Sequence, residues 1–257
     1  MCGTEVTRSC LVYLEWYCRL LGMERGEETA GLSVAWEELE RREREERSPS
    51  LEVLSQMARI AIKFASIERA PMYSETHNEN DAEHSYMLGL VAAELSEMLY
   101  SDLNVERVRA YSQVHDLVEL ETGDMPSLLL TREELDEKDK QEKLALVKLV
   151  KELPLGMARD LIEYEEQAVK EARYVKAVDK LLPITTDINM IVSGQSAVIH
   201  KRFNDVFGIE TYEQLVKAHE EFEGEYNNRF GQEFPELVDI LAGQRMALAS
   251  VLKSAGR

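Results

Sequence analysis

The sequence contains few residues that interrupt helices and few cysteines. Only 13 glycines and 6 prolines occur among 257 residues. With abundant leucine, glutamate, alanine and lysine, this composition excludes collagen-like and disordered chains and favours a mostly helical protein. The three cysteines, Cys2, Cys10 and Cys18, are an odd number without the paired spacing of zinc ligands. A disulfide scaffold and a structural zinc site are therefore excluded, and a reducing compartment is indicated.

Long apolar runs and an excess of positive charge are also missing. No stretch reaches the roughly 18 consecutive apolar residues that a membrane-spanning helix needs. The apolar patch Cys10–Cys18 is interrupted by Glu15 and lacks a small-residue cleavage site, so we expect a cytoplasmic protein without membrane contact. With 30 basic and 49 acidic residues, the formal net charge is −19. Such a surface repels a nucleic-acid polymer, and a small anionic substrate would need a local metal ion or arginine.

Turn and capping signals divide the chain into three expected sections. Residues 1–49 form an N-terminal helical extension with an apolar helix near Leu11–Leu21, residues 50–190 form the core, and residues 191–257 form C-terminal helices packed on that core. No alternating apolar pattern of useful length predicts a strand. Because 44% of the residues are hydrophobic, the chain can bury a substantial core, and we expect an all-α fold.

Several helix boundaries are marked in the sequence. A capping box pairs the residue before a helix with a Glu or Gln three positions later, and this spacing occurs at Asn80–Glu83, Thr131–Glu134 and Thr211–Gln214. Gly123 and Pro126 are expected to end a helix that begins near Asn104. Of the remaining histidines, we expect His77 in a solvated loop and His200 and His219 on the surface.

Two polar residues occupy expected inward positions on separate helices. His84 precedes Leu88 by one turn, on a stripe that continues through Val91, Leu95 and Met98. Asp179 falls on a stripe formed by Val175, Val178 and Leu182. A buried carboxylate is unfavourable by several kcal/mol, roughly, unless it is paired or binds a metal. Taken alone, His84 is explained as a hydrogen-bonded histidine of the core. Asp179 alone is explained as an ion-pair partner of Arg173 or Lys176.

A third helix carries the pair His115-Asp116, with Glu119 one turn beyond His115 and on the same face. A single His-acid pair is expected by chance in so acidic a chain. Polar residues directed inward from three separate helices are harder to explain as isolated core residues, and together they indicate a metal site.

The order His84, His115-Asp116, Asp179 resembles the H…HD…D pattern of the HD-domain metal-dependent phosphohydrolases. The likeness covers roughly residues 55–189, about half of the chain, and implies an HD-domain helical bundle with extra N- and C-terminal helices. Longer strings are similar to the YfbR-like 5′-(deoxy)nucleotidase branch: Ile67-Glu-Arg-Ala-Pro71, Glu79-Asn-Asp-Ala-Glu-His84, His115-Asp-Leu-Val-Glu-Leu-Glu-Thr-Gly-Asp-Met-Pro126 and Lys176-Ala-Val-Asp179.

The resemblance implies that one divalent ion is bound by two imidazoles and two carboxylates: His84, His115, Asp116 and Asp179. This donor set suits Mn²⁺, Co²⁺, Fe²⁺ or Ni²⁺, with Mg²⁺ and Zn²⁺ as alternatives. Such an ion polarises a phosphoryl oxygen and offsets its charge. Binding of a small phosphate ester at this ion is therefore compatible with the strongly acidic composition.

The resemblance also assigns roles to residues around the ion. Glu119 orients or deprotonates water, Arg69 binds the phosphate, and Asp124 acts beside the sugar or leaving-group oxygen. From the residues alone, Arg69 can be a cation that stabilises the C-terminus of its helix. Glu119 and Asp124 can likewise be a pair of surface residues. In the deoxynucleotidase branch a tryptophan follows the arginine and crowds the sugar, whereas Ala70 stands here.

Ala70 predicts weaker discrimination between ribose and deoxyribose, or entry of a bulkier substrate, because a methyl group leaves space that an indole fills. The alternative is that Tyr73 or Tyr86 supplies the missing bulk. The function that these residues favour is metal-dependent hydrolysis of nucleoside 5′-monophosphates. The alternatives are triphosphate release from nucleoside triphosphates and a non-catalytic scaffold that binds a nucleotide or a protein. We further expect a homodimer, because Leu11, Leu14, Leu20 and Leu21 supply a large apolar surface.

Overall fold

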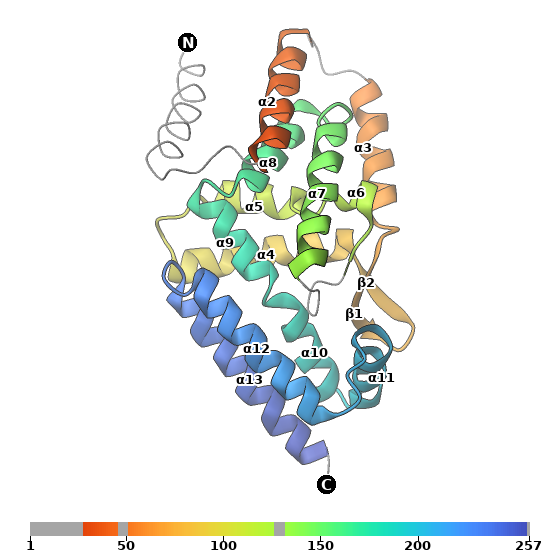
Figure 1. The fold of residues 1–257 in the computed structure, drawn as a ribbon, viewed down its shortest axis with the longest axis vertical. Coiled ribbons are helices and arrows are strands. Elements are labelled where there is room, and N and C mark those ends of the chain that lie inside the picture. The colour runs from red at the N-terminus through yellow and green to blue at the C-terminus, as the bar shows by residue number, and fades with distance from the viewer. Residues whose placement is uncertain (1–27, 46–50, 126–131, 256–257) are drawn as a thin grey trace.

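The computed structural model describes residues 28–125 and 132–255, except 46–50, and consists almost entirely of helices (Figure 1). The all-α prediction is confirmed. The helices are α2 (Glu28–Glu45), α3 (Leu51–Phe64), α4 (Asp81–Leu99), α5 (Val105–Val114), α6 (Glu119–Thr122), α7 (Arg132–Leu149), α8 (Leu155–Glu166), α9 (Lys170–Asp179), α10 (Leu182–Val192), α11 (Ser196–Phe207), α12 (Tyr212–Phe230) and α13 (Pro235–Ala255).

A short antiparallel hairpin of β1 (Glu68–Ser74) and β2 (His77–Asn80) is the only sheet among the described residues. Its register is irregular between Glu68 and Met72 and again between Met72 and Ser74, and Pro71 lies within β1. These interruptions explain why no alternating pattern marked it, because a bulge shifts the inward face of a strand. The hairpin packs on α10 and α11.

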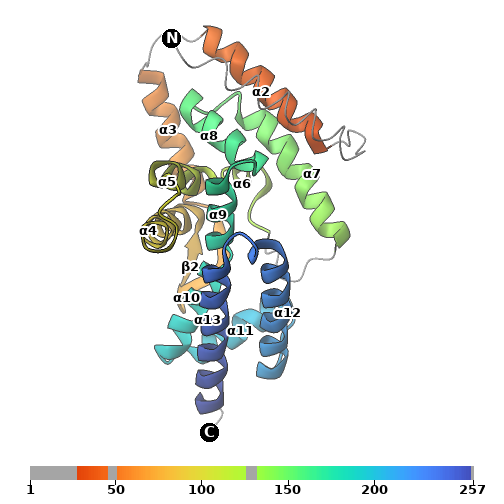
Figure 2. The same cartoon turned by 90° about the vertical axis from the view of Figure 1, so that its left-hand side faces the viewer.

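The helices form groups that follow one another along the long axis of the molecule (Figures 1 and 2). At one end α2 packs on α7 and α8, around a buried core that includes Leu39, Leu146 and Leu161. In the middle α4, α5 and α9 pack on one another. At the other end α12 and α13 form an antiparallel pair, and α10 packs on α13 (Figure 1). The chain therefore crosses from one end to the other through α9 and α10.

The capping signals position the helices that carry the polar residues. Both halves of the capping box at Asn80 and Glu83 are formed at the start of α4, and the box at Thr211 and Gln214 is formed at the start of α12. Asn104 caps α5 through its side chain. Thr131 and Pro126 lie outside the described residues, so the box and the break predicted there stay predictions.

The helix expected from Asn104 to Gly123 is interrupted. Helix α5 ends at Val114, and a single turn, α6, follows from Glu119. Between them the backbone bonds tighten to three-residue spacing, as in Leu117 N–H to Val114 O at 3.0 Å and Glu119 N–H to Asp116 O at 2.9 Å. Such a tightened stretch is frequent at functional positions within helices. The pair His115-Asp116 therefore lies in a turn and not in the interior of a helix.

Other expectations differ in detail. Met98 is 74% exposed and does not belong to the inward stripe of α4, whose main described contacts are with α5 and α9. The apolar segment Leu11–Leu21, and with it the contact from which a dimer is expected, lies outside the described residues. No described helix is both long and apolar enough to span a bilayer.

Candidate metal centre and substrate cavity

Three elements that are distant in sequence bring the predicted metal-binding side chains together. His84 comes from the first turn of α4, His115 follows α5, and Asp179 is the last residue of α9. The Nε2 atom of His84 lies 2.9 Å from Asp179 Oδ1. His115 Nε2 lies 3.8 Å from the same oxygen and 2.9 Å from Asp116 Oδ2. His84, His115 and Asp179 therefore form a group able to hold a cation, and Asp116 adjoins this group beside His115.

The hydrogen bonds of the two histidines fit metal binding. His115 Nδ1 lies 3.0 Å from the carbonyl oxygen of Ser112, which leaves Nε2 directed at the carboxylates without a hydrogen-bond partner among the described residues. His84 Nδ1 lies 3.3 Å from Glu79 Oε2. Metal-binding histidines commonly direct their second nitrogen to a carbonyl or a carboxylate, which fixes ring orientation. The nitrogen and oxygen donors present here suit a borderline divalent cation.

Arg69 is enclosed by four carboxylates beside this group. Its Nη1 atom lies 2.6 Å from Asp116 Oδ2, 3.2 Å from Asp81 Oδ1 and 3.8 Å from Glu119 Oε2. Its Nε atom lies 3.4 Å from Glu79 Oε2. One guanidinium cannot offset all four carboxyl groups in their ionised form away from water. Either some of them stay protonated or an additional cation is bound beside them.

Burial and this dense charge shift the proton affinities strongly. Burial, together with the carboxylates of Asp116, Asp124 and Asp81, raises the pKa of Glu119 to about 11. Burial alone would also raise the pKa of Asp116, but His115 and Arg69 beside it hold that pKa well below its usual range. Burial disfavours charge on His84, yet the carboxylates of Asp179 and Glu79 outweigh it and raise the pKa of His84 to about 9.

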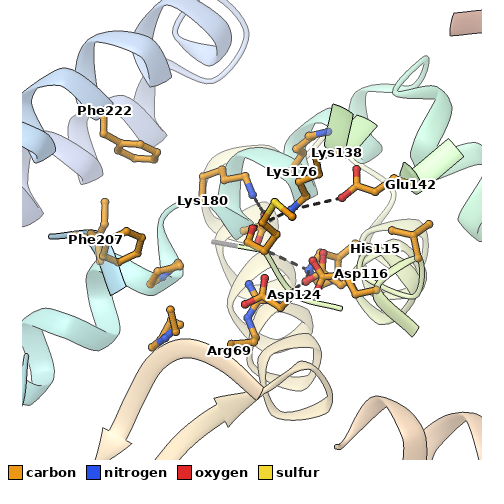
Figure 3. A pocket seen from close by; sticks show the side chains of 18 of the residues that line it. Arg69, His115, Asp116, Asp124, Lys138, Glu142, Lys176, Lys180, Phe207 and Phe222 are labelled. Atoms are coloured by element: carbon orange, nitrogen blue, oxygen red, sulfur yellow. Dashed lines mark hydrogen bonds and ion pairs between the residues drawn. The ribbon is translucent and has the colours of Figure 1, made fainter. Parts of the chain in front are cut away.

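A cavity of about 290 Å³ opens directly beside these groups. In Figure 3, Arg69, His115, Asp116 and Asp124 gather on one side of it. Another part is lined by Lys138 of α7, Lys176 of α9 and Lys180, which directly follows α9. Phe207 of α11 and Phe222 of α12 lie across the cavity from the metal-binding group (Figure 3). The cavity thus has a densely charged end and, opposite it, an end that includes aromatic rings.

The remaining predicted site residues also line the cavity. Asp124 follows Gly123, whose φ of 73° requires glycine and turns the chain after α6. Ala70 lies next to Arg69 in β1 and lines the cavity as well. Among the described residues, neither tyrosine supplies the missing bulk there. Tyr73 donates a hydrogen bond to Glu79, and Tyr86 is 71% exposed.

Two simpler explanations considered from the sequence are wrong. Asp179 does not pair with Arg173 or Lys176. Its Oδ2 atom lies 2.8 Å from Lys180, whereas Arg173 pairs with Glu233 at 2.7 Å. Arg69 does not stand at a helix C-terminus, because it belongs to β1. Arg69 is held in the site by carboxylates such as that of Asp116. Asp179 is held by His84 and by its neighbour Lys180.

Sequence reasoning missed several residues of the site. Glu79 is 1% and Asp81 is 0% exposed, and both contact Arg69. The inward position of Glu79 in a four-residue strand could have been inferred only if the hairpin had been foreseen. His219 was expected on the surface but is 5% exposed and lines the cavity. His77 is exposed as expected, but it begins β2 and does not lie in a loop, and its ring contacts Glu83.

Comparison with known proteins agrees with this geometry. A family model described as HD domain matches residues 63–223, beyond the expected core and into α12. A 5′-deoxynucleotidase of Pectobacterium atrosepticum is 32% identical over 124 residues, which are 45% of this chain and 62% of that protein. A 5′-deoxynucleotidase of Yersinia pestis is 28% identical over 145 residues, 53% of this chain and 74% of that protein. The chain thus spans less than two thirds of the Pectobacterium relative.

A solved structure shares the fold. It is described as a predicted metal-dependent phosphohydrolase of Magnetospirillum magnetotacticum, and it superimposes with a TM-score of 0.51 at 22% identity. The superposition covers 75% of this chain and 94% of that one. The family model spans more than half of the sequence, and its match includes all four convergent histidines and aspartates. The chain therefore belongs to the HD domain family.

Proposed function

We propose that this protein is a divalent-metal-dependent phosphohydrolase that releases phosphate from nucleoside 5′-monophosphates. The observation that carries the proposal is a group of His84, His115 and Asp179 able to hold a cation, with Asp116 beside it. This group lies next to a cavity that Arg69 also lines. The names of the Pectobacterium and Yersinia relatives, both 5′-deoxynucleotidases, support the substrate class. The donor atoms suit Mn²⁺, Co²⁺, Fe²⁺ or Ni²⁺ as the bound ion, with Mg²⁺ and Zn²⁺ as alternatives.

His84, His115, Asp116 and Asp179 would hold the ion. When bound there, it supplies positive charge that polarises a phosphoryl oxygen and favours the nucleophilic form of water. Arg69 lies at the cavity wall next to Asp116, so its guanidinium can bind the remaining phosphate oxygens. A planar fork of N–H donors matches a phosphate dianion, and the carboxylates around Arg69 keep it charged and oriented.

Glu119 and Asp124 would handle protons. Glu119 is 6% exposed and belongs to the same carboxylate group as Asp116. Its high pKa is set by burial and by neighbouring negative charge, so added positive charge shifts it toward the carboxylate, the form that accepts a proton from water. Asp124 lies at the cavity wall beyond Arg69, where it can act beside the leaving oxygen or the sugar (Figure 3).

Release of triphosphate is the second candidate, and the observation that favours it is the group of three lysines along the cavity. Two of them are engaged, because Lys138 lies 3.5 Å from Glu142 and Lys180 lies 2.8 Å from Asp179. Among the described lining residues, eight carboxylates oppose six cationic side chains. A triphosphate brings about twice the negative charge of a monophosphate, so this balance favours the monophosphate.

A phosphate-release panel tests the proposal. The purified protein is incubated with nucleoside mono-, di- and triphosphates, with each divalent metal and with a chelator, and the products are identified. Orthophosphate from monophosphates, abolished by the chelator, is the expected result. Release of tripolyphosphate from nucleoside triphosphates would instead support the second candidate function. Absence of turnover with every metal would refute both and leave a binding scaffold.

A further inference from the structure

A buried ion pair lies in the part of the cavity formed by α10 and α11. Arg202 Nη2 donates to Asp187 Oδ2 at 2.7 Å, and the two side chains are each 6% exposed. Both residues line the cavity. No role falls to this pair in the proposed phosphate chemistry, and neither residue is among the described ion-pair partners of Arg69.

The pair is incompletely satisfied. Among the described residues, Arg202 Nε and Nη1 and Asp187 Oδ1 are buried without a hydrogen-bond partner. A buried donor or acceptor left without a partner is unfavourable, and such groups are completed by an ordered water, an ion or a bound molecule. The ion pair between α10 and α11 accounts for Arg202 Nη2 and Asp187 Oδ2 only. The remaining atoms are two donors and one acceptor on side chains that line the cavity.

Aromatic rings flank this polar edge. Phe203 lies under the Arg202 guanidinium, whose Cζ is 4.5 Å from the ring centroid, and Phe207 lies 5.5 Å from Phe203 between centroids. Phe222 of α12 faces the same space (Figure 3). Flat apolar walls next to adjacent donors and acceptors match a planar heterocycle, since nucleobases stack on aromatic side chains and expose both kinds of group at one edge.

An anion fits this end of the cavity poorly. Asp187 already offsets the charge of Arg202, and its free oxygen would repel a second phosphate. A neutral, planar, hydrogen-bonding group meets no such repulsion. The metal-binding group lies across the cavity from Phe207 and Phe222 (Figure 3), so a molecule with a phosphate at one end and a flat polar ring at the other would contact both ends.

We propose that Arg202, Asp187 and the rings of Phe207 and Phe222 form a nucleobase-binding subsite, so that the enzyme requires a base-bearing phosphate ester. This inference rests on the proposed function for its substrate but assigns residues outside the phosphate site. The subsite lies on α10, α11 and α12. It makes these helices a source of selectivity and not only a cover for the cavity.

The test compares a nucleoside 5′-monophosphate with ribose 5-phosphate, which has the sugar and phosphate but no base. The metal-loaded protein is expected to prefer the nucleotide in kcat/KM by about 5- to 100-fold, the range that base–aromatic stacking supplies. Binding of the four nucleosides, which lack phosphate, is measured by calorimetry on the same protein. At least one nucleoside is expected to bind.

Two conservative variants keep the fold and remove the recognition. Arg202→Lys retains a cation for Asp187 but removes the planar donors, and Phe222→Leu retains an apolar side chain but removes the ring. Each is expected to lower the nucleotide-to-ribose-phosphate ratio at least fivefold and to weaken nucleoside binding. The matched controls are Lys201→Ala, an exposed neighbour of Arg202, and Phe230→Leu, a buried ring of α12 outside the cavity. Both should keep the wild-type ratio.

The outcomes separate this inference from the proposed function. Equal kcat/KM for the two esters together with no nucleoside binding overturns the subsite but leaves the phosphohydrolase intact. If neither ester is hydrolysed, the proposed function fails, and nucleoside binding lost in Arg202→Lys still decides the subsite. Ratios that fall equally in Phe230→Leu and Phe222→Leu would also overturn it, because general loosening of α12 would then explain the effect.

Discussion

Glu79 offers a sharp test of how the metal centre is built. Its carboxylate lies 3.3 Å from His84 Nδ1 and accepts a hydrogen bond from the Tyr73 hydroxyl at 2.7 Å. It is 1% exposed, and no atom of it belongs to the convergent donor group. Replacement by glutamine preserves size and one acceptor but removes the negative charge that orients the His84 ring and increases its basicity.

The expected magnitude follows from this indirect position. Loss of a carboxylate that orients a metal-binding histidine weakens metal affinity about 10- to 100-fold, which corresponds to about 1.4–2.7 kcal/mol. Glu79→Gln is expected near the lower end because the amide oxygen can still accept from Nδ1. Tyr73→Phe removes only the hydroxyl that positions Glu79, and it should weaken binding by less than Glu79→Gln.

Metal affinity is measured by titrating the metal-free protein with Mn²⁺ or Co²⁺ in a calorimeter. Glu94→Gln serves as the control, since Glu94 is exposed on the same helix and loses the same charge. Thermal unfolding of each metal-free variant checks that the fold is retained. A Glu79→Gln variant that is folded and binds either ion as tightly as Glu94→Gln would refute the reasoning that Glu79 acts through His84.

Three further predictions concern single side chains. Glu119→Ala is expected to retain the metal but lose about 10²–10⁴-fold in kcat, the usual range for a general base. Asp116→Ala is expected to lose both the metal and the activity. Wild-type turnover by Glu119→Ala in the phosphate assay would disprove the role of Glu119 as a base. Ala70→Trp, which adds bulk to the cavity wall beside Arg69, is expected to raise the preference for deoxyribonucleotides measured as a kcat/KM ratio, and strong deoxy preference already in the wild type would contradict the reasoning. Burial, reinforced by Arg202, lowers the pKa of His219 to about 4. The unfolded chain therefore binds a proton at this residue near pH 6.5, whereas the folded chain binds it only near pH 4. The free energy of unfolding is expected to fall by about 3 kcal/mol as the pH drops from 6.5 to 4. Urea unfolding of His219→Gln should show that much less acid sensitivity, and an unchanged pH dependence would show that His219 is not the group responsible.

The sequence predicted those features that depend on local signals. The capping boxes at Asn80 and Thr211 are formed because they need only residues three positions apart. His84 and Asp179 were placed inward correctly because apolar neighbours one turn away define the buried face. Roles for Arg69 and Asp124 follow from the resemblance, and the structure adds that both line one cavity with His115, Asp116 and Asp179.

The features that escaped prediction depend on contacts between distant segments. Glu79 and Asp81 become important only because the hairpin folds Arg69 against them. His219 is buried because α12 packs over α11, which the composition of α12 alone does not reveal. The tightened turn after Val114 has no distinctive residue, since neither glycine nor proline occurs there. Tertiary packing sets these positions, and a single sequence records it only indirectly.

The central claim is that His84, His115, Asp116 and Asp179 bind one divalent ion on which hydrolysis depends. The most direct measurement is the metal content per chain, by elemental analysis after dialysis, of the wild type and of His115→Ala and Asp179→Ala, alongside orthophosphate release from a nucleoside 5′-monophosphate. The account predicts one ion per wild-type chain, loss of the ion and of phosphate release in both variants, and recovery of chelator-treated wild type on adding Mn²⁺ or Co²⁺. Full phosphate release by the metal-free wild type, or a full metal complement in both variants, would contradict it.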